Sequence, residues 1–213
     1  MKPLKRIFES REAVFAGFLV ATLGAGCVTP GGGGTELFNG KNLDGWEVTD
    51  FAGGGAIKVK DGEIHMAMGE LISGINLAHE NIPRTNYELE AEAMKLDGND
   101  FFCGLTFPVG DTFASFIPGG WGGTVVGISS IDGMDAAENE TATFKQFKTH
   151  QWYHFRVRVT PSKIQCWVDD EMVVDLLLED RAIALRAGPI ELSVPIGITS
   201  FQTVTRIRNI RLQ

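Results

Sequence analysis

The fold of this chain is decided by one short stretch, Glu36-Leu37-Phe38-Asn39-Gly40-Lys41-Asn42-Leu43-Asp44-Gly45-Trp46. It holds the turn dipeptides Asn39-Gly40 and Asp44-Gly45, in which glycine accepts a positive φ and the Asn or Asp side chain hydrogen-bonds nearby backbone. Its large apolar side chains are Leu37, Phe38, Leu43 and Trp46. A segment that turns repeatedly while burying a Trp indicates an anchor at the edge of a β-sandwich or barrel.

Composition and charge place the rest of the chain in the same class. The 213 residues include 26 glycines and 14 phenylalanines, and short apolar runs between glycines favour strands over helical bundles. The formal net charge is −8. Because phosphate binding needs concentrated Lys and Arg, this charge argues against a nucleic-acid partner.

Side-chain alternation identifies the individual strands. In 87–94 apolar residues alternate with glutamates, which predicts a strand, although Glu and Ala also favour a helix. The same reasoning predicts further strands at 57–60, 63–68, 71–73, 101–109, 113–117, 125–131, 152–160, 163–168, 171–177, 191–194 and 203–212. The chain is therefore expected to be all-β, with a turn of helix or a packed loop at 178–187.

Residues 1–27 have the features of an export signal. A basic start is followed by an apolar run at 13–23 that is too short to span a bilayer stably. Leu23-Gly24-Ala25-Gly26-Cys27 resembles a bacterial lipobox, with Gly24 where Leu is usual, and predicts lipidation of Cys27; ordinary cleavage and an uncleaved anchor are the alternatives. Residues 28–35 then form a glycine-rich linker and 36–213 the domain. We therefore expect a bacterial envelope lipoprotein, periplasmic or on the outer membrane, that contacts the membrane only through this lipid.

Two cysteines remain in the domain, Cys103 and Cys166, each within an apolar run. They are expected to be buried thiols. A disulfide between them is the alternative in an oxidising envelope, and sequence alone does not give the distance between their Cα atoms.

Trp121 stands out because two glycines lie on each side of it, in Pro118-Gly119-Gly120-Trp121-Gly122-Gly123. The glycines can leave the indole face open, so that the apolar C–H face of a sugar stacks on it. Equally, Trp121 can be buried across a bend that the glycines permit. Both interpretations are open at this point.

An acidic loop follows at 129–141. It contains Asp132, Asp135, Glu138, Asn139 and Glu140, which could hydrogen-bond sugar hydroxyls, bind Ca²⁺ or supply a general base. A solvated acidic loop is the alternative. Its nearness to Trp121 suggests one site, with Trp121, Asn139 and Asp135 binding substrate. No metal-ligand motif is present, so no cofactor is predicted beyond a Ca²⁺ option.

The opening stretch, the segment 152–175 with its Trp-Tyr-His and Trp-Val-Asp-Asp-Glu runs, and the closing segment 203–212 resemble the 3-keto-disaccharide hydrolase domain family over roughly 36–213. The resemblance implies a concanavalin-like jelly-roll of two antiparallel sheets that handles sugars. This chain differs from the family pattern at 99–107, where Asn99-Asp100 replaces the family's Asn-Ser and the family's Arg is missing.

The resemblance also implies a reaction. A ketone at C3 acidifies the C2 hydrogen, and the oxygen at C1 can then leave by elimination, which requires a base and a group that stabilises the enolate. In this interpretation the chain cleaves 3-keto-glycosides, with Asp132, Glu138 or Glu140 as base. A non-catalytic, lectin-like module for oligosaccharides is the main alternative, and an adhesion domain a weaker one.

Overall fold

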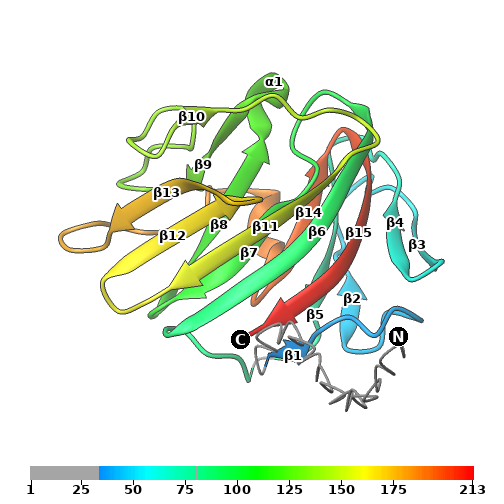
Figure 1. Cartoon of the computed structure of the whole chain (residues 1–213), viewed down its shortest axis with the longest axis horizontal. Coiled ribbons are helices and arrows are strands. Elements are labelled where there is room, and N and C mark those ends of the chain that lie inside the picture. Colours follow the sequence, from blue (N-terminus) through cyan, green and yellow to red (C-terminus); the bar gives the residue numbers. More distant parts are fainter. Residues whose placement is uncertain (1–33, 80) are drawn as a thin grey trace, which may run out of the picture. The chain divides into compact units, whose positions relative to one another are not determined.

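The computed structural model describes residues 34–79 and 81–213. The predicted export signal, the lipidation of Cys27 and linker residues 28–33 lie outside this range. The described residues form two antiparallel sheets that pack face to face (Figure 1). The all-β prediction is confirmed. Among these residues no helix has both the length and the apolar character needed to cross a membrane.

The first sheet is here named the β6 sheet and has the strand order β13-β12-β11-β6-β15-β4-β3, with β1 paired to β15. Its strands are β1 (Thr35–Glu36), β3 (Ile57–Lys60), β4 (Glu63–Met66), β6 (Tyr87–Gly98), β11 (Trp152–Val159), β12 (Lys163–Val168), β13 (Glu171–Leu177) and β15 (Thr203–Leu212).

The second sheet, named the β8 sheet, has the order β10-β9-β8-β7-β14-β5-β2. Its strands are β2 (Trp46–Val48), β5 (Ile72–Leu77), β7 (Gly104–Val109), β8 (Thr112–Gly119), β9 (Val125–Ser129), β10 (Thr143–Phe144) and β14 (Gly197–Phe201).

The opening stretch joins the two sheets. β1 pairs with β15 of the β6 sheet, and β2 pairs with β5 at the edge of the β8 sheet. Asn39 accepts hydrogen bonds from the backbone N–H of Lys41 and Asn42 through its own side chain, so the expected turn forms. Trp46 is 5% exposed, and its indole N–H donates to the Leu37 carbonyl at 2.7 Å. The predicted anchor is confirmed.

The interior between the sheets contains a cluster of aromatic rings. Phe102, which precedes β7, meets Phe147 edge-on at 5.1 Å, and Phe147 meets Tyr153 of β11 at 5.0 Å. Such pairs add about 0.5–1.5 kcal/mol beyond the burial of their area. Cys103 and Cys166 are buried and free, and burial raises the pKa of both thiols. The disulfide alternative is wrong for these residues.

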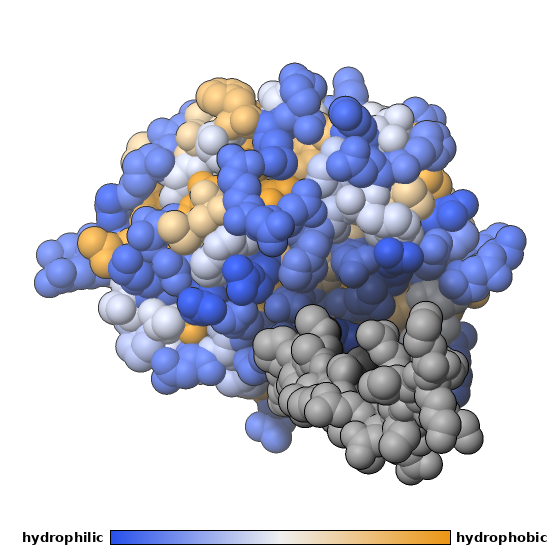
Figure 2. Space-filling model, viewed as in Figure 1, coloured by the Kyte–Doolittle hydropathy of each residue, from blue (hydrophilic) through white to orange (hydrophobic). Residues whose placement is uncertain are grey.

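The outer face of the β6 sheet is charged. Glutamates of β6 pair with arginines of the neighbouring strands, as in Arg208 with Glu92 at 2.8 Å. Arg208 also lies 3.9 Å from the Trp152 ring centroid, and Arg156 lies 4.0 Å from that of Trp167. Figure 2 shows a largely hydrophilic surface over these strands. The strand prediction for 87–94 is confirmed, because its glutamates face water while Leu89, Ala91 and Ala93 are buried.

The structure differs from the prediction at several elements, including β7, η1 (Pro189–Ser193) and β14. β7 begins at Gly104 rather than at residue 101, because the Asp100 side chain accepts the Phe101 N–H and turns the chain. The strand expected at 191–194 is wrong: η1 is a 3-10 helix, begun by a proline that fits the first helical turn. β14, which lies between β5 and β7, has no counterpart in the prediction.

The Trp46 anchor predicts a large stability effect. We expect Trp46→Ala to lower the free energy of unfolding by about 3–5 kcal/mol, since it empties a buried site and removes a buried hydrogen bond. Urea denaturation followed by circular dichroism measures this loss. Trp121→Ala is the matched control and should cost far less, because Trp121 is 39% exposed. Equal losses in the two variants would contradict the assignment.

The Glu92 ion pair predicts a pH dependence. Burial by itself would raise the pKa of the Glu92 carboxyl, but hydrogen bonds from Asn209 and Arg208 outweigh it and lower that pKa. A lowered folded-state pKa stabilises the protein above the unfolded pKa, and this stability is lost as the pH falls through the folded value. Glu92→Gln should therefore lower the free energy of unfolding at pH 7, and in acid the stability of the variant should approach that of the wild type. Urea denaturation at a series of pH values measures both.

The control for this prediction is Glu47→Gln. Glu47 lies exposed on β2 and has no ion pair within the described part of the chain. A Glu92→Gln effect that stayed constant from pH 7 down to strongly acidic pH would contradict the electrostatic origin.

Candidate functional site

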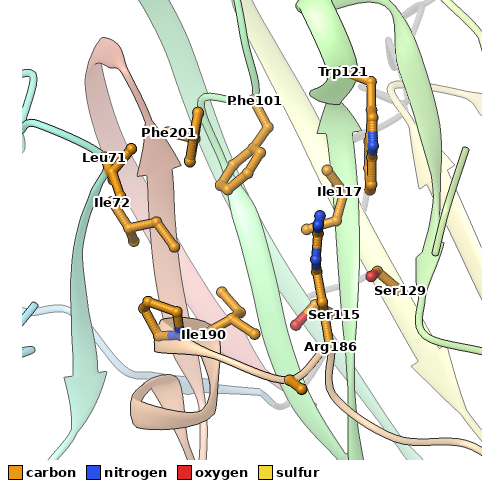
Figure 3. Close-up of a pocket in the computed structure, with 12 residues that line it drawn as sticks. Leu71, Ile72, Phe101, Ser115, Ile117, Trp121, Ser129, Arg186, Ile190 and Phe201 are labelled. Carbon is orange, nitrogen blue, oxygen red and sulfur yellow. The ribbon is translucent and has the colours of Figure 1, made fainter. Parts of the chain in front are cut away.

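A cleft lies on the face of the β8 sheet that points away from the core. On β8, Ala114 and Phe116 are part of the core, so Ser115 and Ile117 point the other way and line a cavity of about 320 Å³. The segment 186–190, which leads into η1, closes one side. Figure 3 shows the remaining lining side chains, which are Leu71, Ile72, Phe101, Trp121, Ser129, Arg186, Ile190 and Phe201.

Trp121 stands in a short turn labelled α1 (Gly120–Gly123). Its own backbone is left-handed, with φ 49° and ψ 54°, and Gly122 has φ 89°. At Gly123 a Cβ would lie 2.9 Å from the Asn99 carbonyl oxygen, so only glycine fits there. The glycines thus serve a tight turn, and the indole at its tip is 39% exposed and lines the cavity. Trp121 is not sealed in the interior.

A second hollow of about 180 Å³ adjoins the first, and both are lined by Phe101, Trp121, Arg186 and Phe201. Together they are named the Trp121 cleft. Asp100 lines the second hollow. Its Oδ1 accepts the Phe101 N–H at 2.8 Å and its Oδ2 accepts the Gly122 N–H at 3.1 Å. This carboxylate therefore connects the chain on one wall of the cleft to the Trp121 turn on the other.

Arg186 brings positive charge into the cleft. Its guanidinium lies 5.9 Å from the Trp121 ring centroid, and its Nε lies 3.4 Å from Asp135 Oδ2. The hydroxyl of Ser129 donates to Asp135 Oδ1 at 3.1 Å. Asp135, a predicted substrate-binding residue, thus contacts two lining residues of the cleft. Arg186 therefore links Trp121 to the acidic loop, because it lies near the Trp121 ring and pairs with Asp135.

The other predicted residues of the loop are held by protein contacts. Asp132 and Glu140 both pair with Arg181, and neither is a lining residue of the cleft. The N–H of Ala182 and the guanidinium of Arg181 hydrogen-bond Asp132 and lower the pKa of its carboxyl. Glu138 accepts the Asp135 N–H at 3.4 Å. The base role assigned to Asp132, Glu138 or Glu140 stays a prediction.

Asn139 is buried, and its side chain braces the loop. The amide nitrogen donates to the carbonyls of Ile128, Met134 and Asp135, while the amide oxygen accepts from the N–H and the hydroxyl of Thr141. With its hydrogen-bonding atoms engaged in this way, Asn139 shapes the loop that carries Asp135.

In the part of the chain that the structure describes, no group of three or more His, Cys, Asp or Glu side chains is arranged to hold a metal ion. Ca²⁺ binding by the acidic loop stays a prediction. The negative charge of the loop is instead met by arginines, Arg181 at Asp132 and Glu140 and Arg186 at Asp135.

Sequence reasoning missed several residues of the cleft. In the sequence, Asp100 is marked only by the departure from the family pattern at 99–107, and Phe101 only as the start of a predicted strand. Arg186 and Phe201 belong to no motif. They reach the cleft from a loop and from the end of β14, which comes beside β5 and β7 only in the folded sheet.

Solved structures share this architecture. The β-glucanase of Bacillus licheniformis superposes with a TM-score of 0.54 at 10% identity, over 85% of this chain and 98% of that one. Carbohydrate binding module CBM66 from Bacillus subtilis superposes with a TM-score of 0.51 at 14% identity, over 79% of this chain and 95% of that one. A β-1,3-1,4-glucanase derived from a mouse hindgut metagenome superposes with a TM-score of 0.52 at 11% identity, over 84% of this chain and 96% of that one. At these identities the likeness shows the fold alone, and the predicted jelly-roll is confirmed.

Comparison with curated proteins finds no match. The sequence pattern of one domain family, in contrast, matches residues 33–213, a range that includes all of the described residues. The chain belongs to the family of 3-keto-alpha-glucoside-1,2-lyase-like domains.

Proposed function

We propose that this domain cleaves 3-keto-glycosides in the Trp121 cleft, by elimination across C1 and C2 of the sugar. The family assignment supports the reaction class. One observation carries the assignment of the site: an exposed indole stands in one cleft with a carboxylate, Asp100, and a guanidinium, Arg186.

The chemistry divides among these side chains. The C2–H bond breaks and its proton passes to the Asp100 carboxylate, while the electron pair delocalises into the C3 carbonyl as an enolate. That pair then forms the C1–C2 double bond as the C1–O bond breaks, and the leaving oxygen takes the proton that Asp100 removed from C2. Arg186 stabilises the negative enolate oxygen, which is the largest charge developed along this path.

Trp121 has the binding role. Its exposed ring offers an apolar plane for the C–H face of the sugar. Arg186 keeps its orientation through Asp135, whose other oxygen accepts the Ser129 hydroxyl. Asp132 is a weaker choice of base, because hydrogen bonds from the Ala182 N–H and from Arg181 lower the pKa of its carboxyl. Glu140 is paired with Arg181 and is not a lining residue of the cleft.

A non-catalytic carbohydrate-binding module is the second candidate. It is favoured by the two backbone N–H groups that Asp100 already accepts, since these compete with a proton for its lone pairs. Trp121 keeps the same role in both candidates. Turnover of a 3-keto-glycoside distinguishes the enzyme from the binding module.

The envelope lipoprotein assignment remains part of this proposal and rests on the sequence around Cys27. In a bacterial host, labelled palmitate should be incorporated into the wild type. Cys27→Ala should abolish incorporation, because the thiol is the acylated group. Equal labelling of both proteins would contradict the assignment.

The first functional prediction concerns Asp100. We expect Asp100→Asn to lower kcat on a 3-keto-glucoside by about 10²–10⁴-fold, because the base for the C2 proton is lost. Release of the aglycone measures the rate. Asp175→Asn, the same change in an ion pair of β13 with Lys163, is the control and should keep full activity.

The result has clear alternatives. If Asp132→Asn or Glu140→Gln abolishes turnover while Asp100→Asn does not, the base lies in the acidic loop. If the wild type binds sugar and turns over no 3-keto-glycoside, the binding-module candidate replaces the enzyme.

The second functional prediction concerns Trp121. Trp121→Ala should raise the Kd or KM for the glycoside up to about tenfold, as expected for the loss of about 0.5–1.5 kcal/mol of stacking, with a smaller effect on kcat. Calorimetry and steady-state kinetics measure the two quantities. Phe144→Ala removes an aromatic side chain that is 75% exposed on β10 and should change neither. Unchanged binding in Trp121→Ala would contradict the site.

A further inference from the structure

The larger hollow of the Trp121 cleft offers few polar side chains to a ligand. They are Ser115, Ser129 and Arg186. Ser115 already shares a hydrogen bond of 2.9 Å with the Thr106 hydroxyl, and Ser129 donates to Asp135. A second sugar ring would bring several hydroxyls into this hollow, and a buried hydroxyl without a partner costs about 1–3 kcal/mol. The larger hollow is therefore poorly suited to a sugar.

Apolar surface dominates the same hollow. Phe101 and Phe201 form one wall, with ring centroids 5.9 Å apart and planes inclined by 37°. Figure 3 shows Ile72 and Ile190 below this pair and Ile117 with Trp121 opposite it. Rings that are offset or tilted in this way leave edges and faces against which a further flat ring packs well.

The Asp100 carboxylate lies outside the larger hollow. The carboxylate of Asp100 belongs to the smaller hollow, where Arg186 and Trp121 complete the lining together with Phe101 and Phe201. Arg186 borders both hollows, so the two ends differ in that only the smaller one also holds a carboxylate, while the larger one is lined mainly by apolar side chains. The larger hollow, at about 320 Å³, falls at the lower limit of the volumes of small-molecule sites.

We propose that the substrate of this cleft is an aryl glycoside. Its sugar ring lies against Trp121 in the smaller hollow, between Asp100 and Arg186, and its aromatic aglycone enters the larger hollow beside Phe201. This proposal rests on the proposed function only in taking the Trp121 cleft as the sugar site. It assigns to the apolar end an aromatic ring in place of a second sugar.

Binding of unoxidised glycosides tests the proposal without turnover. Calorimetry on the full chain would compare phenyl glucoside, methyl glucoside and trehalose, with the phenyl and methyl compounds of the same anomeric configuration. We expect phenyl glucoside to bind about tenfold or more tighter than methyl glucoside, as one additional stacked ring provides, and tighter than trehalose.

Variants of Phe201 locate the effect. Phe201→Ala should remove most of the preference for phenyl over methyl glucoside. Because Phe201 also lines the smaller hollow, methyl glucoside should lose some affinity too, but less than phenyl glucoside loses. Phe201→Leu keeps apolar volume in β14 without the ring, and it serves should the alanine variant fail to fold. Phe144→Ala, an exposed aromatic on β10, is the control and should keep the preference.

The outcomes separate this proposal from the function on which it builds. Equal affinity for phenyl and methyl glucoside, tighter binding of trehalose, or an undiminished preference in both Phe201 variants would overturn the aryl assignment. Turnover of 3-keto-trehalose with no aryl preference would overturn only this inference. A Phe201-dependent aryl preference without any turnover would uphold it and overturn the lyase proposal.

Discussion

The alternation of side chains across the β8 sheet is the constraint on which the rest of the structure depends. Successive residues of a strand point to opposite faces, so β8 directs Phe116 into the core while Ser115 and Ile117 form the cleft floor. The core and the cleft are two sides of one sheet. A shift of register by one residue would exchange them, and the packing of Phe116 against Phe155 of β11, with ring centroids 6.4 Å apart, opposes such a shift.

The walls of the cleft come from loops that this sheet positions. Asp100 lies in the connection from β6 to β7 and accepts hydrogen bonds from the backbone N–H groups of Phe101 and Gly122, so one carboxylate fixes the spacing of two aromatic walls. The left-handed backbone of Trp121 and the glycines around it would be costly in isolation. The Asp100 contact, together with the close approach of Gly123 to Asn99, holds that turn in place.

Charge is distributed unequally between the two sheets. The outer face of the β6 sheet carries paired Glu and Arg side chains, among them Glu92 with Arg208, which neutralise one another and keep that face in water. The cleft on the β8 sheet holds little charge, and what it holds is concentrated on Asp100 and Arg186. In an otherwise apolar cleft, two opposite charges are less screened by water, which supports the proposed abstraction of a proton next to a developing enolate.

The sequence by itself determined the strands whose signal is local. Period-two alternation located β6, β11, β12, β13 and β15, and the turn dipeptides of the opening stretch identified the anchor around Trp46, because burial on one face and the conformational needs of glycine act between near neighbours. The glycines also identified Trp121. Only the tertiary structure decided that Arg186 stands beside Trp121, that Phe201 lines the same cleft, that Asp100 joins both walls, and that Arg181 engages Asp132 and Glu140. These contacts join residues far apart in the chain, and they depend on sheet order and on loop paths, which no local pattern of side chains encodes.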